Sequence, residues 1–458
     1  MPYGLSTEPV QSGTGTTKVH SPDILIGQSR NEQDMLTRLK LSNFKAWRES
    51  GDIQLKPVTL LLGENSTGKS SLLQSLLLMK QTATSPDPTV HLNLGDEVND
   101  SVDMGSFEDL LTRNPEKRKV GIELDAVHDK DHCFFSVEYA QDSKKSPIID
   151  SMKLSTDGEN WFRVARAERS AFGLYLPGET RTSLKARSYS PERGIAFSSE
   201  AIAVLGEHGK TVQRLSLQLR RELESIAYLG PLRNKPKRTY IWNRTRPGII
   251  GDDGSNAIPA LLASAQTGKK NGDDLVASVS RWLKKMKIAD KLEVKQLSAG
   301  HYSVLIHRDG VAANLRDVGI GISQVLPVLV LAYFAPPCST ILLEEPEIHL
   351  HPQAQSLLAE LFLEVSKKRN VQFIVETHSE HLFRRMQTLV AKKKATPEQC
   401  ALYFVERKKS DAVLKTLAMD HFGRLSNWPQ NFFGDTTGEV REQAKQTMLR
   451  MKQARKTS

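Results

Sequence analysis

Apolar and polar residues follow two different periods along this chain, and the two periods predict both strands and helices. Leu39 and Leu41 alternate with polar residues, which predicts a strand where regular structure begins. Over 70–82 the leucines recur on one face of a helix instead. Three short apolar stretches are typical of strands buried in a parallel sheet, and they cover residues 58–63, 339–343 and 371–377. Strands that alternate with helices in this way predict an α/β fold.

The middle of the chain interrupts the α/β pattern twice. Three alternating segments look like antiparallel strands of an inserted sheet, over 120–127, 133–139 and 148–154. From about 183 to 288 the pattern becomes helical and is broken by basic loops. We therefore expect five parts: a mobile tail over 1–35, an N-terminal lobe with the antiparallel β-subdomain over 36–175, a small helical and basic insertion over 176–290, a C-terminal lobe over 291–425 and a C-terminal segment over 426–458.

Composition narrows the class of protein. The chain has 458 residues, of which 39% are hydrophobic, so it can bury a sizeable core in two or three domains. No apolar stretch approaches the ~18–20 residues that span a bilayer, and the first residues lack the pattern of a secretory signal. The three cysteines lie far apart, which fits a reducing cytosol. We expect a cytoplasmic protein with no membrane partner, whose net charge of +10 permits binding to nucleic acid.

The strongest chemical signal runs from Gly63 to Ser70, which fits the pattern GxxxxGK[ST] between a buried strand and a helix. Glycines let the backbone curl so that amide groups face phosphate oxygens at the helix N-terminus. Lys69 supplies a charge for the β- and γ-phosphates, and Ser70 supplies a hydroxyl for Mg²⁺. We therefore predict ATP and Mg²⁺ as cofactors. The predicted nucleotide-binding residues are Gly63, Glu64, Asn65, Ser66, Thr67, Gly68, Lys69, Ser70 and Ser71.

The second signal is a pair of carboxylates at the end of an apolar strand. Glu344 and Glu345 follow residues 341–343, and ligands of open α/β sheets bind at the carboxyl ends of the strands. Glu344 would hold Mg²⁺ directly or through water, and Glu345 would polarise an attacking water. The alternative is a strand followed by an acidic surface turn.

Two further motifs would reach the same sheet edge. His378 follows the strand over 371–377, where its ring would hydrogen-bond a γ-phosphate or the attacking water. His378 and His381 form an HxxH, but the missing third histidine and cysteine ligands argue against zinc. A glycine-rich turn precedes the helix expected over 325–335 and makes another anion-binding site at a helix N-terminus. Its residues are Gly319, Gly321, Ser323 and Gln324.

The order of these motifs resembles the ABC-type ATPase heads of the SMC and RecF-like group. The resemblance implies that the Gly-Ser-Gln turn contacts the γ-phosphate bound on the opposite protomer, that 346–352 is the D-loop and that His378 is the switch histidine. Two heads would then sandwich two ATP molecules, as a homodimer or a higher even oligomer. The chain departs from this pattern, since the turn reads Gly-Ile-Ser-Gln, Glu344 replaces the commoner Asp and no coiled-coil arm is present. Gln81 is the candidate for the Q-loop glutamine.

The amino-acid sequences of 228–233, 344–352 and 422–429 resemble those of a narrower bacterial branch of this ATPase group. These are short-armed AAA-labelled ATPases with an uncharacterised C-terminal segment, often found in anti-phage and plasmid-defence loci. Overcoming-lysogenisation-defect (OLD) nucleases carry a similar head fused to a metal-dependent Toprim domain, and 404–406 resembles the start of that domain. No DxD follows Glu406, so we expect any nuclease or effector to be a separate partner protein.

A basic loop is a candidate for contact with DNA or with a partner protein. Between 225 and 251 the chain has no acid, and Tyr240 and Trp242 are interleaved with six cations. The cations are Arg233, Lys235, Lys237, Arg238, Arg244 and Arg246. Contact with DNA, contact with a partner protein, and a solvated loop whose rings pack inward all fit this pattern.

Together the motifs predict an ATP-hydrolysing dimeric switch that acts in antiviral defence with a separate effector. A RecF-like DNA-repair ATPase and an ATP-dependent scaffold that does not hydrolyse ATP are the alternatives. Glu345 favours hydrolysis over the scaffold, because a head that only binds ATP has no need for that carboxylate.

Overall fold

The computed structural model describes residues 35–427 and 442–448, except 97, 99, 129–130, 169–170, 180–183 and 268–273. The described residues belong to one compact unit, Asn31–Ser458. The tail predicted over 1–35 lies outside the described residues except for Met35, and so does most of the C-terminal segment predicted over 426–458.

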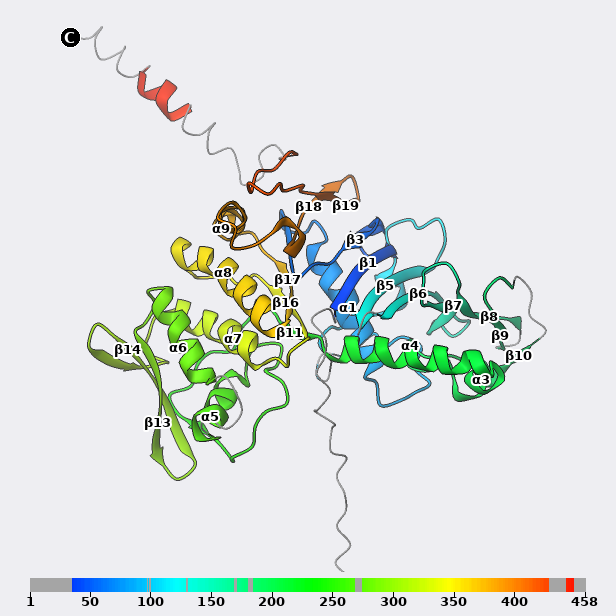
Figure 1. Cartoon of the computed structure of the whole chain (residues 1–458), viewed down its shortest axis with the longest axis horizontal. Coiled ribbons are helices and arrows are strands. Elements are labelled where there is room, and N and C mark those ends of the chain that lie inside the picture. The colour runs from blue at the N-terminus through cyan, green and yellow to red at the C-terminus, as the bar shows by residue number, and fades with distance from the viewer. Residues whose placement is uncertain are drawn as a thin grey trace, which may run out of the picture. The chain divides into compact units, whose positions relative to one another are not determined.

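A six-stranded sheet forms the centre of the unit (Figure 1). Its strands run in the order β11 (Ala227–Leu229), β16 (Thr340–Glu344), β17 (Gln372–Glu376), β4 (Val58–Gly63), β18 (Cys400–Lys408) and β19 (Asp411–Thr416). The first five strands are parallel, and β19 is antiparallel to β18. The three buried strands expected from the sequence are confirmed, and they lie side by side as β16, β17 and β4.

Alternate side chains of these strands enter two different cores. On β4, Leu60 and Leu62 face one core and Leu61 faces the other, as expected for a strand covered on both faces. The first core holds five helices: α5 (Ala257–Thr267), α6 (Leu275–Lys285), α7 (Ile320–Phe334), α8 (Pro352–Arg369) and α9 (Glu380–Ala391). The second core holds α1 (Lys69–Ala83) and α4 (Glu207–Glu224). The layered arrangement confirms the predicted α/β class.

The predicted antiparallel insertion is also confirmed, as a nine-stranded sheet packed into the second core. Its order is β10 (Lys185–Ala186), β9 (Phe172–Tyr175), β8 (Phe162–Arg166), β7 (Pro147–Ser155), β6 (Asp131–Gln141), β5 (Val120–His128), β1 (Met35–Phe44) and β2 (Trp47–Glu49), with β3 (Ile53–Gln54) paired to β1. Short helices α2 (Phe107–Leu110) and α3 (Ser199–Val204) complete this half. A small third sheet joins β12 (Tyr240–Ile241), β14 (His301–Arg308), β13 (Lys291–Ser298) and β15 (Val311–Asn314).

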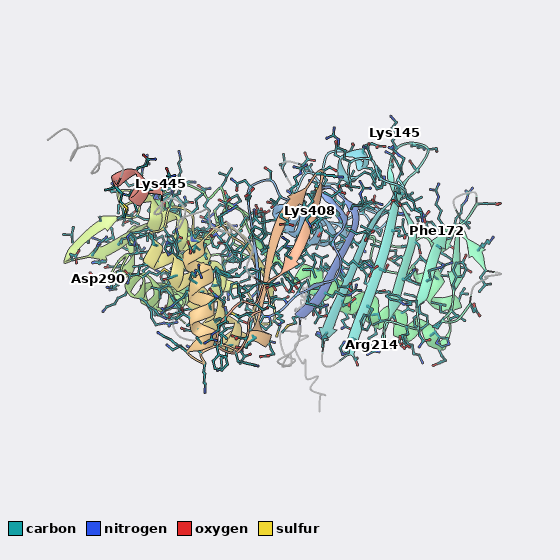
Figure 2. The ribbon with its side chains drawn as sticks, turned by 90° about the horizontal axis from the view of Figure 1, so that it is seen from above. Lys145, Phe172, Arg214, Asp290, Lys408 and Lys445 are labelled. Atoms are coloured by element: carbon teal, nitrogen blue, oxygen red, sulfur yellow. The ribbon has the colours of Figure 1, made fainter. Side chains whose placement is uncertain are left out.

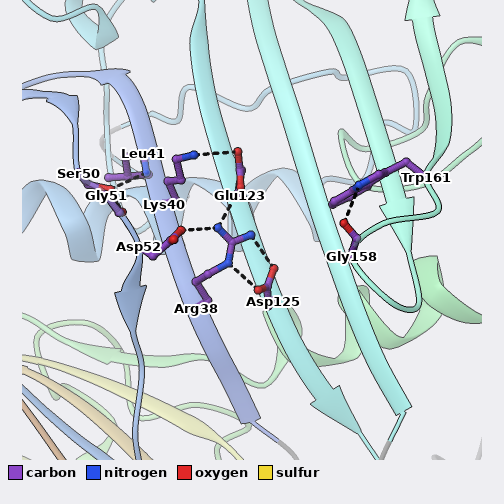
Figure 3. Close-up of polar contacts among 10 residues, drawn as sticks. All are labelled: Arg38, Lys40, Leu41, Ser50, Gly51, Asp52, Glu123, Asp125, Gly158 and Trp161. Atoms are coloured by element: carbon purple, nitrogen blue, oxygen red, sulfur yellow. Dashed lines mark hydrogen bonds and ion pairs between the residues drawn. The ribbon is translucent and has the colours of Figure 1, made fainter. Parts of the chain in front are cut away.

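Arg38 links three segments on the polar face of the antiparallel sheet (Figure 3). Its guanidinium donates to Asp125 and Glu123 on β5 and to Asp52 before β3, at 2.5, 3.0 and 2.7 Å. These hydrogen bonds hold β1 against β5 and against the segment before β3. Seen from above, Phe172 of the antiparallel sheet and Asp290 before β13 lie on opposite sides of the β18–β19 hairpin, which Lys408 marks (Figure 2).

Helix α7 differs from the prediction. It begins at Ile320 rather than 325, so Pro327 lies inside it. An interior proline removes one backbone hydrogen bond and costs about 3 kcal/mol. Nearly every residue from Ile322 to Ala332 is buried, and this packing offsets the cost. The Gly-Ser-Gln turn is therefore the start of the helix, with Gly319 as its N-cap.

Candidate nucleotide-binding site

The predicted phosphate loop connects β4 to α1, and its backbone needs glycine at two positions. Gly63 has φ +147°, and a Cβ there would lie 2.2 Å from the carbonyl oxygen of Val405 on β18. Gly68 caps α1 with φ +111°, and a Cβ there would crowd Ala412 and Ala46 at 3.1 and 3.2 Å. The loop is thus wrapped closely by its neighbours while its tip, 64–66, stays exposed. An exposed tip before a helix N-terminus suits an anion.

Lys69 lies inside the loop. Its ammonium donates to the carbonyls of Glu64 and Gly63 at 2.7 and 3.2 Å and lies 3.6 Å from a carboxylate oxygen of Glu376. The side chain is only 2% exposed, and burial lowers its pKa. The next residue, Ser70, hydrogen-bonds the same Glu376 carboxylate. Thr67 is buried and donates to Glu64, which shapes the turn, and Ser71 lies in the first turn of α1.

Glu344 ends β16 in direct register with Glu376 on β17. The hydroxyl of Tyr228 on β11 donates to Glu344 at 2.9 Å. Burial and the neighbouring Glu376 raise the pKa of Glu344 to about 7, and burial also raises the pKa of Glu376. The end of the sheet therefore holds two carboxyl groups that are poorly solvated and close together.

Glu345 and His378 come together, as the sequence predicted. The Nε2 atom of His378 lies 3.8 Å from Oε1 of Glu345, whose side chain is 35% exposed. Glu345 has φ +44°, an unusual conformation for a residue with a side chain. Buried Glu347 accepts hydrogen bonds from the Thr377 hydroxyl and the His378 amide, at 2.7 and 2.8 Å, which fixes the turn after β17. Burial lowers the pKa of His378, which favours a neutral ring.

The Gly-Ser-Gln turn begins α7, whereas the phosphate loop begins α1, and these two helices cover opposite faces of the central sheet. Ser323 is buried and its hydroxyl donates to the carbonyl of Ile320, while Gly319 and Ile320 are exposed. A Cβ on Gly321 would lie 3.0 Å from the carbonyl oxygen of His349, so the turn adjoins the predicted D-loop.

Sequence reasoning missed three residues of the site: Tyr228, Arg233 and Glu376. Glu376 ends an apolar strand just as Glu344 does, and this repeated pattern was the signal available in the sequence. Tyr228 on β11 donates to the Glu344 carboxylate, and Arg233, in the loop after β11, donates to the backbone carbonyls of Glu344 and Glu345. Both residues come more than 110 positions before these partners, so no local pattern reveals the contacts.

The basic loop needs two corrections. Arg233 is only 7% exposed and donates to backbone carbonyls beside the carboxylates, so it is not free to contact a nucleic acid. Arg238 forms a bidentate pair with Asp317 at 2.6 and 2.9 Å. Tyr240 and Trp242 pack against the first core, as expected if this is a solvated loop whose rings pack inward. The four other cations, Lys235, Lys237, Arg244 and Arg246, are exposed.

Gln81 is not placed to act as a Q-loop glutamine. It is buried in the last turns of α1, where its amide donates to the carbonyls of Asn93 and Val102 and accepts from the Val102 amide. It lies twelve residues beyond Lys69, about 18 Å along the helix. Its side chain anchors the 93–102 loop instead.

The residues present fit a magnesium ion that is completed by nucleotide phosphates. Within the described residues, no group of three or more His, Cys, Asp or Glu side chains is arranged to hold a metal ion by itself. Mg²⁺ is commonly held by one or two carboxylates together with substrate phosphates. Ser70, Glu344 and Glu376 offer such oxygens, and one buried oxygen of Glu376 has no hydrogen-bond partner in the described structure.

A lysine enclosed by a glycine-bordered loop, with carboxylates at the adjacent strand ends, defines an ATP-binding P-loop domain. Residues 58–384 match the family described as "AAA domain, putative AbiEii toxin, Type IV TA system". The chain belongs to this family. Residues 396–443 match a second family, a protein of unknown function designated DUF3696.

Known proteins extend this comparison. An OLD nuclease of Thermus scotoductus is 28% identical over 365 residues, which are 75% of this chain and 59% of that protein. This chain therefore spans less than two thirds of the length of the relative. Among solved structures, an SMC head domain from Thermotoga maritima matches at 14% identity with a TM-score of 0.42, over 84% of this chain and all of that one.

An Smc head from Pyrococcus furiosus, bound to the C-terminal domain of ScpA, matches at 12% identity with a TM-score of 0.43, over 84% of this chain and 96% of that one.

Among the described helices of this chain, none is both long and apolar enough to cross a membrane.

Proposed function

We propose that this chain binds ATP with Mg²⁺ and hydrolyses it to ADP and phosphate. The observation that carries the proposal is the meeting of Glu345 and His378, 3.8 Å apart, at the sheet edge beside the phosphate loop. Lys69 would neutralise the β- and γ-phosphates. Ser70, Glu344 and Glu376 would hold Mg²⁺, which neutralises charge that develops on the phosphate oxygens.

Glu345 is suited to act as the general base. Its side chain is 35% exposed and directly follows the end of β16, where a water can reach it. In its carboxylate form it would accept a proton from the attacking water. The neutral ring of His378 would orient that water or hydrogen-bond the γ-phosphate.

We further propose that two such heads close around ATP, with Ser323 of each protomer meeting the nucleotide held by the other. Support comes from the position of the turn, whose exposed start lies on the opposite side of the sheet from α1. The turn and the phosphate loop begin helices that pack into different cores, so we propose that each turn meets the nucleotide of the other protomer. Opening and closing of the dimer would then act as the switch.

The biological role that best fits is antiviral or plasmid defence with a separate effector. Family membership and the OLD nuclease relative support it. A RecF-like role in DNA repair remains the second candidate, because four exposed cations extend from the basic loop. We propose a cytoplasmic location on the basis of the separated, buried cysteines.

Two variants test the hydrolytic proposal. Glu345→Gln keeps the size of the side chain and removes its basicity, so hydrolysis should fall roughly 10²–10⁴-fold. ATP binding, measured by calorimetry, should persist, and light scattering with ATP should show an accumulated dimer. Lys69→Ala should instead lose ATP binding. Hydrolysis by Glu345→Gln at the wild-type rate would refute the assignment of the base, and no hydrolysis by wild type, even with DNA added, would favour the scaffold alternative.

A further inference from the structure

We propose that Arg233 is a positioning residue that holds Glu345 in its strained backbone conformation and ties it to the start of α7. This inference rests on the proposed ATP hydrolysis. It assigns a role to a side chain that contacts neither the phosphate loop nor a carboxylate oxygen, but only the backbone around them.

Arg233 makes an unusual set of contacts for a buried cation. One terminal nitrogen donates to the carbonyls of Glu344 and Glu345 at 3.0 and 3.1 Å, and the other donates to the carbonyl of Gln324 at 3.3 Å. Burial lowers the pKa of the guanidinium to about 10, so it remains charged at neutral pH. A charged donor makes these hydrogen bonds stronger than neutral ones.

The first of these contacts explains how Glu345 keeps φ +44°. A left-handed conformation outside glycine persists only where the surroundings determine it from several sides. The amide of Glu345 donates to the carbonyl of Glu376 at 2.9 Å, and its own carbonyl accepts from both Arg233 and the Ile348 amide. Arg233 is the only side chain in this set, so it is the part that a substitution can remove.

The contact between Arg233 and the Gln324 carbonyl connects Glu345 to the Gly-Ser-Gln turn. Gln324 follows Ser323 in α7, and Gly321 of the same turn lies against the carbonyl of His349 in the segment after Glu345. A shift of the α7 start would therefore move the Arg233 guanidinium and, with it, the backbone of Glu345. Binding at the turn and activation of water at Glu345 would be coupled through one side chain.

A lysine cannot reproduce this arrangement. The planar guanidinium reaches three carbonyls on two segments with two nitrogens, whereas an ammonium is a single point donor. The carboxylates of Glu347 and Glu345 interact electrostatically with Arg233, and Glu347 is engaged by Thr377 and the His378 amide. Shape as well as charge is therefore required at position 233.

The test compares Arg233→Met with a matched control, Arg369→Met. Arg369 also donates to two backbone carbonyls, those of Ala332 in α7 and of its C-cap Ala335, at 2.9 and 2.8 Å, but at the far end of the helix. We expect Arg233→Met to lower kcat for ATP hydrolysis about 10–100-fold with KM changed less than about threefold, since a small displacement of a catalytic group has effects of this size. Arg369→Met should lose thermal stability while kcat stays near wild type.

A double-mutant cycle separates positioning from general damage. If Arg233 acts through Glu345, then Arg233→Met should cause no further loss in a Glu345→Gln background. An equal loss in both backgrounds, or an equal kcat for Arg233→Met and Arg369→Met, would overturn the inference. If Arg233→Met does not fold, Arg233→Lys serves in its place and should show the same loss of kcat and the same non-additivity.

Failure of the inference can be told from failure of the proposed function. A wild-type protein that hydrolyses ATP alongside an equally active Arg233→Met variant contradicts only the role of Arg233. A wild-type protein without hydrolysis contradicts the proposed function and, with it, this inference.

Discussion

Glu344 and Glu376 lie next to each other at the end of the central sheet, and neither is well solvated. Burial, together with repulsion from Glu376, favours the protonated form of Glu344 and raises its pKa to about 7, and burial also raises the pKa of Glu376. The group binds its proton more tightly in the folded than in the unfolded protein. Its contribution to stability is therefore present at pH 4.5 and is lost as the pH rises toward 7 and above.

Glu344→Gln should accordingly stabilise the nucleotide-free protein, and more so at pH 8 than at pH 5. The amide still accepts from Tyr228, while the buried charge is gone. The gain at pH 8 should be on the order of 1–3 kcal/mol, and thermal unfolding at the two pH values measures it. A gain of equal size at both pH values would contradict the pKa assigned to this carboxyl.

The same variant should hydrolyse ATP poorly, because Glu344 is one of the predicted Mg²⁺ ligands. Stability and function would then have opposite requirements at one residue, as is common where carboxylates are held close together for a metal.

At the scale of secondary-structure elements, the packing of β4 against β18 and the function of the phosphate loop place requirements on the same residue. The two strands are parallel neighbours, with Val405 in register with Gly63 where the phosphate loop begins. The close approach lets the loop turn sharply, but it leaves no room for a side chain at the turn. The pairing of the strands and the shape of the loop are thus one geometric requirement.

Gly63→Ala should therefore disturb both the pairing of β4 with β18 and the shape of the phosphate loop. The new Cβ would lie 2.2 Å from the Val405 oxygen, and φ +147° is strained for alanine. We expect a loss of about 3–5 kcal/mol in the free energy of unfolding, from overpacking and backbone strain together. Gly248→Ala is the control, because a Cβ there meets nothing within 4 Å. Denaturant titration that finds the two variants equally stable would contradict the proposed packing.

Elements with a clear period could be predicted from the sequence, and long-range contacts could not. The apolar runs of β4, β16 and β17 gave their positions to within about one residue, because burial on both faces makes most positions of each strand apolar. The start of α7 was predicted five residues too late, because the glycine-rich turn was interpreted as preceding the helix, whereas it forms the start of the helix. Arg233 looked like an exposed cation because its partners, three carbonyls, have no signature in a sequence.

At the scale of the whole molecule, the basic loop retains four exposed cations that a nucleic acid would meet. If they contact DNA phosphates, replacing Lys235, Lys237, Arg244 and Arg246 with Ala should weaken binding and reduce the salt dependence of log K by up to about 3.6, at roughly 0.9 per phosphate contact. Fluorescence anisotropy over a series of salt concentrations measures both changes.

A charge-matched control replaces four exposed lysines elsewhere, Lys284, Lys367, Lys392 and Lys394. An equal effect of the control would mean that net charge, and not the loop, attracts DNA. Binding by neither wild type nor variants would remove DNA from the set of partners.

The position of β18 inside the central sheet also sets the order in which the protein can form. Val58 pairs with Cys400, which lies 342 positions further along the chain. At about 5–20 residues per second, a ribosome needs roughly 20–70 s to make the chain between them. During that time β4 has no partner on that edge, and Gly63 has no Val405 to pack against. The phosphate loop should therefore reach its final shape only near the end of synthesis, after most of the family domain over 58–384 has already emerged.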